Sequence, residues 1–506
     1  MKTAPWAQAL AVAVGSAICA APARAQGLAE GAAVERIGSA DMASRVGILS
    51  DDSMMGRDTP SEGLERAATY VIGEFRRLGL RPAGEDGTYL QRFGVTRWAV
   101  DTAISRIRLH AGAKDVAVDL VRGARFVGGR MPETPVSGAT VVLTGPLTPR
   151  AVSNSWLRGR VVLVPVDYSR PLAPDLGDRL DQLAAQAAAV VLLSNRDSAT
   201  RAQRLAASLE PRLTPDFRDD SLGAPVVELF DDTAAPVLSA AGLDPARLRA
   251  ADRSEAREKP RLQIELTLAR RVLERGDPPN LVAALDGSDP QLAGEYVAIS
   301  AHLDHLGMRA GPGDSIYNGA DDNASGVAGL LELAEAFAGG EPDTRPEHRR
   351  SLLFVVPSGE EKGLWGSDYF TRHPTVPLDR IVADLNMDLI GRNWSDSIIV
   401  VGPELSTLGA TLTTTVAAHP ELRMTPLADR WPEERIFYRS DHYNFARRGV
   451  PVLFFTSGTH PDYHQPSDTG DRLDTEKAAR VVRLLFHLTR TIADDSASPR
   501  WTSRLE

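Results

Sequence analysis

Apolar positions recur at helical and strand-like spacing along most of the chain. The clearest helical pattern lies near the N-terminus, where apolar side chains return every three or four residues. Its members are Leu64, Ala67, Ala68, Val71, Ile72, Phe75 and Leu78. Gly79 and Pro82 follow and favour the end of a helix there. We predict further helices over 324–337 and 476–492, and a strand over 89–95.

From about residue 262 to 495, short apolar runs alternate with helical segments. The runs of strand character span 296–301, 352–356, 381–386, 397–401 and 452–455. Strands that alternate with helices are typical of an α/β sheet with parallel strands. We therefore predict an α/β fold for this part of the chain.

The segment from 130 to 255 has a different pattern. Apolar runs recur there at 139–143, 161–166, 189–193 and 225–229, with an alanine-rich helix expected over 180–188. The segment contains no histidine, and a charged stretch at 251–260 indicates a boundary. A chain of 506 residues is also too long for one ordinary core. We predict a smaller module at 130–255, inserted between 26–129 and 256–506 of the main domain.

The first 25 residues have the pattern of a signal peptide. Lys2 precedes a small, apolar stretch, and Ala23-Arg24-Ala25 matches a small-x-small cleavage site, so the mature chain would begin near Gln26. A membrane anchor is the competing interpretation, but the apolar stretch is short. Lipidation of Cys19 is another, but Ile18 before it is not small. We expect an exported protein, periplasmic or secreted, without a membrane span after cleavage.

Composition narrows the possible chemistry. A formal net charge of -10 gives no support for nucleic-acid binding, which favours a basic surface. Cys19 is the only cysteine, so the mature chain would have neither disulfides nor thiolate ligands. Any metal site in the mature chain must therefore use nitrogen and oxygen ligands.

The first candidate ligand is His302, in the motif Ala301-His302-Leu303-Asp304 at the end of a strand. Strand alternation places His302 and Asp304 on one face, where Asp304 could accept a hydrogen bond from one ring nitrogen and leave the other for a metal. His305 is the alternative to His302 as the metal ligand of this motif, but the same alternation turns its side chain to the opposite face of the strand. An exposed histidine beside an aspartate is the ordinary alternative.

Two further motifs carry adjacent acidic residues. The loop from Asn318 to Gly326 opens a helix with Asp321 and Asp322, and its small residues would let the backbone crowd a metal. A helix cap explains one such aspartate more readily than two. We choose Asp322 as a bridging ligand, with Asp321 as the alternative.

Glu360 and Glu361 directly follow an apolar strand. Paired glutamates on a loop are usually solvated, but beside a metal one can act as a ligand and the other as a proton acceptor. Glu361 would ligate, while Glu360 would take a proton from the attacking water.

The last two candidates are Asp388, in an apolar neighbourhood, and His464, in a polar loop after the last strand. A carboxylate buried as Asp388 would be needs a partner, and a metal is one. Tyr463 could donate its hydroxyl to a developing oxyanion. The alternatives are an exposed strand end and an ordinary polar loop. Two imidazoles and three carboxylates together suit a pair of zinc ions that share one carboxylate.

On these motifs, the chain resembles the co-catalytic two-zinc aminopeptidases, a family that includes secreted bacterial enzymes. The resemblance implies a mixed, mainly parallel sheet sandwiched by helices. One zinc ion would take His302 and Asp388, the other Glu361 and His464, with Asp322 bridging. Glu360 would be the general base for hydrolysis of the N-terminal peptide bond of peptide substrates.

The resemblance extends less specifically to other segments. Residues 130–255 look like the protease-associated insert of some of these enzymes, with a partner that the sequence does not identify. Ser440, Asp441 and His442 resemble a family segment on the substrate side of the site.

Three other functions stay open from the sequence. A carboxypeptidase or dipeptidase on the same two-metal fold would need a cation for the substrate carboxylate. Candidates are Arg372, Arg392, Arg435 and Arg439. A glutaminyl-cyclase-like transferase fits less well, because all five ligands of a two-metal site are present. A binding ectodomain without catalysis is disfavoured by the presence of Glu360 beside the ligand set.

Overall fold

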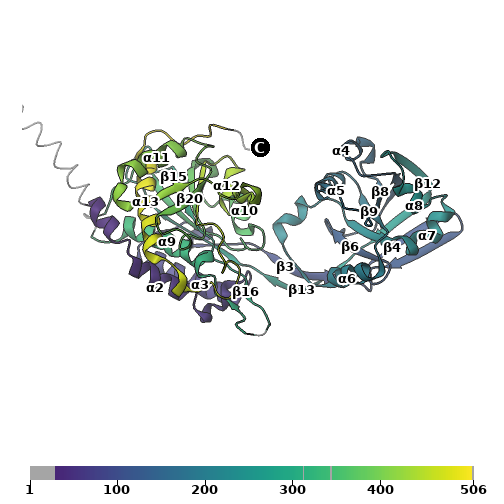
Figure 1. Cartoon of the computed structure of the whole chain (residues 1–506), viewed down its shortest axis with the longest axis horizontal. Helices are drawn as coiled ribbons and strands as arrows, with labels where there is room; N and C mark the ends of the chain where they lie inside the picture. Colours follow the sequence, from purple (N-terminus) through teal and green to yellow (C-terminus); the bar gives the residue numbers. More distant parts are fainter. Residues whose placement is uncertain (1–28, 312, 342–344, 504–506) are drawn as a thin grey trace, which may run out of the picture. The chain divides into compact units, whose positions relative to one another are not determined.

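The computed structural model describes residues 29–311, 313–341 and 345–503 (Figure 1). They form two compact units, one comprising the chain up to Phe93 and from Asp277 onward, the other Gly94–Gly276. The predicted signal peptide, residues 1–25, lies outside the described residues. No helix in the described part of the chain combines the length and apolar character that crossing a membrane requires.

The first unit is built on one large sheet with the order β1-β14-β18-β15-β19-β22-β20-β21, and β2 also pairs with β14. Its strands are β1 (Arg81–Pro82), β2 (Leu90–Arg92), β14 (Pro279–Leu285), β15 (Tyr296–Ser300), β18 (Ser351–Val356), β19 (Ile381–Met387), β20 (Ser397–Val401), β21 (Thr425–Leu427) and β22 (Val452–Thr456). The four central strands, β18, β15, β19 and β22, run parallel, whereas β14 and β20 run antiparallel to their central neighbours. The predicted mixed α/β sheet is therefore confirmed.

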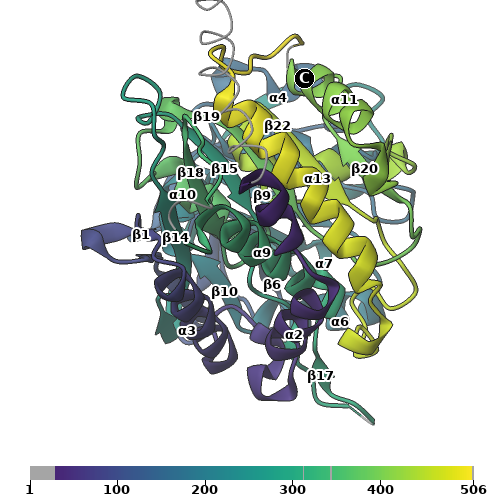
Figure 2. The ribbon, with the colours of Figure 1, turned by 90° about the vertical axis from the view of Figure 1, so that its left-hand side faces the viewer.

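Helices cover both faces of this sheet. One face carries α2 (Ser39–Leu49), α3 (Glu62–Arg77), α9 (Gly326–Ala338) and α13 (Thr475–Asp494), and the other carries α10 (Trp365–Arg372) and α12 (His442–Ala446). Figure 2 shows α9 and α13 in front of the central strands. Along β18, Leu352 and Phe354 belong to the core of one face and Leu353 and Val355 to that of the other. Burial on both faces explains why the central strands are continuous apolar runs.

The local sequence of helix α3 explains where the helix begins and which of its faces is buried. Its N-cap, Ser61, accepts a hydrogen bond from the Leu64 N–H at 3.1 Å, a contact that typically stabilises a helix by about 1 kcal/mol. Glu62 and Glu65 lie in the first turn, where negative charge favours the helix dipole. The expected apolar positions form its buried face.

The strand predicted over 89–95 is in fact two strands, β2 and β3 (Val95–Val100), which belong to different sheets.

The second unit has an eight-stranded sheet of order β5-β4-β12-β7-β8-β9-β11-β6 and a three-stranded sheet of order β10-β3-β13. The larger sheet comprises β4 (Arg106–Ala111), β5 (Lys114–Asp119), β6 (Ala124–Gly128), β7 (Val136–Leu143), β8 (Val161–Val166), β9 (Ala189–Ser194), β11 (Val226–Phe230) and β12 (Ala256–Thr267). The smaller comprises β3, β10 (Arg212–Pro215) and β13 (Arg270–Gly276). Its helices are α4 (Pro149–Val152), α5 (Leu176–Ala184), α6 (Ser198–Leu209), α7 (Asp231–Ala240) and α8 (Pro245–Arg249). The helix expected over 180–188 is α5, which begins and ends four residues earlier.

The boundaries of the second unit differ from the insert expected at 130–255. The unit extends to Gly94 on one side and Gly276 on the other. The physical reason is strand pairing, because β12 lies between β4 and β7 and joins both flanks of the expected insert to its centre. Residues 94–129 and 256–276 therefore fold with the second unit.

Candidate metal centre

The five predicted ligands come together at the carboxyl ends of the central parallel strands. His302, Glu361, Asp388 and His464 lie in the segments that follow β15, β18, β19 and β22, and Asp322 lies in the turn Ala320–Ser325 before α9. Because parallel strands end at the same edge of a sheet, residues far apart in sequence meet there.

Asp322 lies between two histidines, with one carboxylate oxygen toward each. Its Oδ1 is 3.4 Å from His302 Nε2, and its Oδ2 is 3.1 Å from His464 Nε2. His302 Nε2 is also 3.3 Å from Asp388 Oδ1, and His464 Nε2 is 3.2 Å from Glu361 Oε2. The arrangement forms two half-sites that share one carboxylate.

Two atoms of the first half-site point to a bound cation. His302 Nε2 and Asp388 Oδ1 are both buried, and among the described residues neither has a hydrogen-bond partner. Leaving such groups unpaired is costly, and a cation between them would satisfy both. Glu360 lies close enough to join His302 and Asp388 around one ion. The donor set of imidazoles and carboxylates fits zinc.

His305 corrects an expectation from strand alternation. Its ring is buried, and its Nδ1 lies 2.8 Å from Glu361 Oε1 and 3.8 Å from Asp322 Oδ2, so it points into the second half-site. Strand β15 ends at Ser300, so the two-residue alternation does not continue to position 305. His305, Asp322 and Glu361 can surround one ion.

The expected hydrogen bond between the Asp304 carboxylate and His302 is also absent from the structure. The carboxylate Oδ1 lies 3.8 Å from His302 Nδ1, whereas the backbone carbonyl of Asp304 is at 3.2 Å. Asp304 Oδ1 instead accepts the backbone N–H of Glu360 at 3.1 Å. Asp304 therefore contacts two parts of the centre. Its backbone carbonyl lies beside the His302 ring, and its carboxylate holds the loop that carries Glu360.

The loop that carries Asp322 needs glycine at its start. Gly319 has a φ of +57°, and a Cβ there would lie 2.1 Å from the carbonyl oxygen of Asp322 and 2.5 Å from the His305 ring. The Asp468 carboxylate accepts the N–H groups of both Asp321 and Asp322 at 3.1 Å. Asp468 lies four residues after His464 in the same polar loop, and nothing in the sequence indicates its role.

Asp321, the alternative bridging residue, faces away from the half-sites. Its Oδ1 accepts the N–H of Gly391 at 2.7 Å, and its Oδ2 lies 3.4 Å from His460. Asp322 is therefore the residue of this pair that lies between the two histidines.

Arg57, which the sequence analysis did not single out, holds two of the site's loops by their backbones. Its guanidinium is fully buried and donates to the carbonyls of Leu303 at 2.8 Å, Asn318 at 2.7 Å, Gly319 at 2.9 Å and Leu49. Leu303 lies between His302 and Asp304, and Gly319 begins the turn to Asp322. Burial lowers the pKa of Arg57 to about 10, so it stays cationic at neutral pH.

The two adjacent glutamates have different electrostatic surroundings. Burial, together with the charges of Glu361 and Asp388, raises the pKa of Glu360 well above its usual range. Burial also opposes ionisation of Glu361, but hydrogen bonds from His305 and His464 outweigh it and hold the pKa of Glu361 far below its usual value. Glu361 is thus the better ligand and Glu360 the better proton acceptor.

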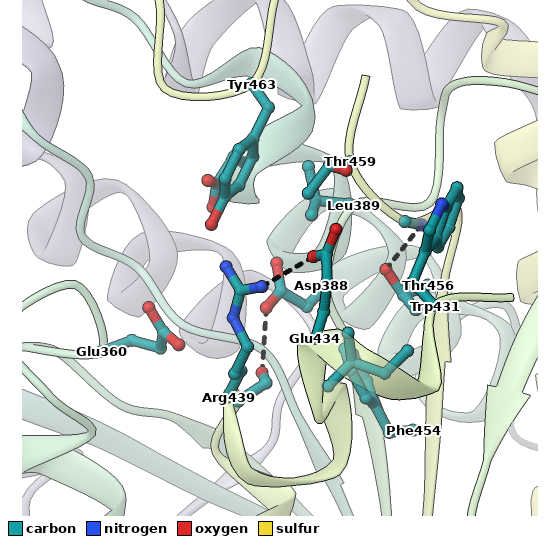
Figure 3. A pocket seen from close by; sticks show the side chains of 14 residues that line it. Glu360, Asp388, Leu389, Trp431, Glu434, Arg439, Phe454, Thr456, Thr459 and Tyr463 are labelled. Carbon is teal, nitrogen blue, oxygen red and sulfur yellow. Dashed lines mark hydrogen bonds and ion pairs between the residues drawn. The ribbon is translucent and has the colours of Figure 1, made fainter. Parts of the chain in front are cut away.

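A pocket beside the half-sites is lined by Asp322, Glu360, Asp388, Leu389, Trp431, Glu434, Ile436, Arg439, Ser440, Phe454, Thr456, Gly458, Thr459 and Tyr463. Figure 3 shows Glu360, Asp388 and Tyr463 around this cavity. Tyr463 stacks on His464 with ring centroids 3.8 Å apart, and burial raises the pKa of its hydroxyl. The hydroxyl therefore keeps its proton and can donate it in a hydrogen bond.

Of the three residues expected on the substrate side, Ser440 alone lines the pocket. Its hydroxyl donates to Asp388 Oδ2 at 2.9 Å and accepts from Asn386 Nδ2 at 2.9 Å, which fixes the Asp388 carboxylate. Asp441 and His442 are fully buried beneath it. Burial raises the pKa of Asp441 to about 7 and lowers that of His442 to about 3.

We predict that Gly319→Ala weakens zinc binding and destabilises the first unit by about 1–3 kcal/mol, the usual cost of a left-handed non-glycine residue. Chemical unfolding and a zinc titration would measure both effects. Gly73→Ala is the matched control, because a Cβ on that α3 glycine meets nothing within 4 Å. Equal behaviour of the two variants would contradict the role given to Gly319.

We predict that Arg57→Met lowers both zinc affinity and stability, because several carbonyls lose their donor at about 1–3 kcal/mol each. Arg66→Met is the control, since Arg66 is half-exposed on α3 and pairs with Glu62 at 2.6 Å, a contact worth under about 1 kcal/mol. Zinc affinity and unfolding free energy would be compared across the three proteins. Unchanged zinc affinity in Arg57→Met would show that the loops hold their positions without it.

Comparison with known proteins finds sequences and structures similar to this chain. The Probable leucine aminopeptidase of Trichophyton verrucosum (strain HKI 0517) is 27% identical over 221 residues, which cover 42% of this chain and 58% of that protein. The human BOS complex subunit NCLN is 31% identical over 231 residues, or 42% of this chain and 40% of that protein. The chain thus spans less than two thirds of the length of these relatives.

Among solved structures, the aminopeptidase from Aneurinibacillus sp. strain AM-1 aligns over 93% of this chain and 96% of its own, with 18% identity and a TM-score of 0.49. The model of Peptidase family M28 matches residues 280–489, the segment that contains all five predicted ligands. Residues 280–489 of this chain are therefore similar to the peptidases of family M28.

Proposed function

We propose that the chain is an aminopeptidase that removes N-terminal residues from peptides at a two-zinc centre. The observation that carries the proposal is the position of Asp322, with one oxygen toward His302 and the other toward His464. Each histidine also faces a carboxylate of its own, Asp388 or Glu361. This is the donor arrangement that two ions with one shared ligand require.

Bound at these half-sites, zinc would polarise the scissile carbonyl and activate a water for attack. His302, Asp388 and Asp322 would hold one ion, and His464, Glu361 and Asp322 the other. His305 would orient Glu361 through the contact between its Nδ1 and Glu361 Oε1.

The remaining steps belong to side chains of the pocket. Glu360 takes a proton from the attacking water as the water oxygen bonds to the carbonyl carbon, and returns it to the leaving amine as the C–N bond breaks. Tyr463, whose hydroxyl keeps its proton, donates a hydrogen bond to the oxygen of the tetrahedral intermediate. Ser440 holds Asp388 in place through the bond to Oδ2.

The charges of the pocket favour an aminopeptidase over a carboxypeptidase. Of the four arginines considered from the sequence, Arg439 alone lines the pocket, and its Nη1 lies 2.9 Å from Glu434 Oε2 (Figure 3). A carboxypeptidase needs a cation for the free carboxylate of its substrate, and this guanidinium already has a carboxylate partner. The largely acidic lining of the pocket instead favours the positive charge of a free α-amine.

The apolar wall of the pocket supports a preference for a large apolar N-terminal residue. Leu389, Trp431, Ile436 and Phe454 line it beside the half-sites. Curated relatives named as probable leucine aminopeptidases are consistent with this substrate class.

We also propose that the protein is exported and acts on peptides in the periplasm or outside the cell. The signal-peptide pattern of residues 1–25 supports this. The second unit, Gly94–Gly276, would then be the protease-associated insert, and its partner stays open.

The adjacent glutamates give the sharpest mutational test. We predict that Glu360→Gln keeps about two zinc ions per chain while the turnover number falls by about 10²–10⁴, the usual contribution of general acid–base catalysis. Glu361→Gln should instead lose zinc, because it removes a ligand charge. Metal analysis and steady-state kinetics separate the two effects. Loss of zinc in Glu360→Gln with full occupancy in Glu361→Gln would reverse the roles.

The end of the peptide that the enzyme recognises can be tested directly. We predict cleavage of a leucyl dipeptide whose C-terminus is amidated, and no cleavage of the same dipeptide with an acetylated N-terminus. Chromatography of the products would measure both reactions, because the amidated dipeptide would release free leucine and the acetylated one, if cleaved, would release N-acetyl-leucine, with the unmodified dipeptide as the matched control. Cleavage of the acetylated dipeptide alone would establish a carboxypeptidase.

A further inference from the structure

A second cluster of metal-binding side chains lies away from the candidate centre. It consists of His419, which follows α11 (Leu408–Ala418), Glu421 in the next turn, and His487 on α13. Each residue offers one ligand atom, and these atoms all lie within 4.8 Å of one another. Helices α11 and α13 lie side by side (Figure 2).

One contact of this cluster is similar in length to those of the centre. His419 Nδ1 lies 3.0 Å from Glu421 Oε1, close to the 3.1 to 3.4 Å that separate histidine nitrogens from carboxylate oxygens in the two half-sites. The imidazoles of His419 and His487 are nearly parallel, at 18°, with centroids 3.5 Å apart. Each imidazole binds an ion through a lone pair in its own ring plane, so one of these stacked rings must turn about its side-chain bonds for both to bind one ion.

A further carboxylate orients the buried ring. Glu30 Oε1 lies 3.1 Å from His487 Nδ1, so His487 can donate there and leave Nε2 for a metal, as metal-binding histidines usually do. The neighbouring cation, Arg490, is itself paired with Glu30 and lies 3.4 Å from Asp494. Its charge is therefore partly neutralised beside the cluster.

Access to the cluster is open from solvent. The side chain of Glu421 is 63% exposed and that of His419 is 26% exposed, whereas that of His487 is 7% exposed. An ion can reach the exposed pair first and then contact the buried ring.

We propose that His419, Glu421 and His487 form a third metal site, for a divalent transition ion such as zinc. Two imidazoles and one carboxylate are typical zinc ligands, with a further position left for water. The ion would join the turn after α11 to the C-terminal helix α13, which packs on α2, α9 and α11. The site does not depend on the proposed function, because none of its residues contributes to the centre.

The test is a zinc count on the mature chain after dialysis against buffered free zinc. Wild type should retain about three ions, two at the centre and one here. His419→Gln and Glu421→Gln should each retain one fewer, with unchanged peptidase turnover. His110→Gln is the matched control, since His110 is exposed on β4 and belongs to no metal-binding cluster of the described residues.

The difference between variants separates this proposal from that for the centre. If the centre held fewer ions than proposed, the zinc count of wild type and of all three variants would fall by the same number. The one-ion difference between wild type and the His419→Gln and Glu421→Gln variants would remain. Glu421 is too exposed for its replacement to unfold the chain, so a lost ion in Glu421→Gln reports binding. Equal counts in wild type and both variants, or a difference seen only at millimolar zinc, would overturn the third site.

Discussion

Repulsion among closely spaced carboxylates is the constraint on which the centre depends. Asp322, Glu360, Glu361 and Asp388 meet within a small volume, with Asp304 directly behind them. Burial and neighbouring negative charge raise the pKa of Asp322 and Glu360, and burial raises that of Asp304 to about 6. Metal cations would relieve this repulsion, and that relief is a source of their affinity.

The fold keeps these groups in place by fixing the backbone beneath them. The positive charge of Arg57 lies under the carboxylates while its N–H groups bind the carbonyls of Leu303 and Gly319. Asp468 binds the same turn from the other side, through the N–H groups of Asp321 and Asp322. Because both supports act on backbone atoms, the ligand side chains keep their geometry and ordering them on metal binding costs little.

The sequence predicted the parts of the site that local patterns encode. Apolar runs located β15, β18, β19 and β22, and the polar residues chosen after them are side chains that the fold brings together. His305 and the Asp304 contact were wrong because alternation stops where β15 ends, at Ser300. Arg57 could not be found, since its contacts with Leu303 and Gly319 join residues 246 and 262 positions apart. The limits of the second unit depend likewise on pairing between β12 and β4.

The way the second unit is inserted explains how the first unit tolerates it. The chain leaves the large sheet after β2 and returns at β14, and these two strands are antiparallel neighbours in which Arg92 lies opposite Pro279. The point of departure and the point of return are therefore adjacent within the first unit. Every residue of the centre, and both of its backbone supports, belong to that first unit.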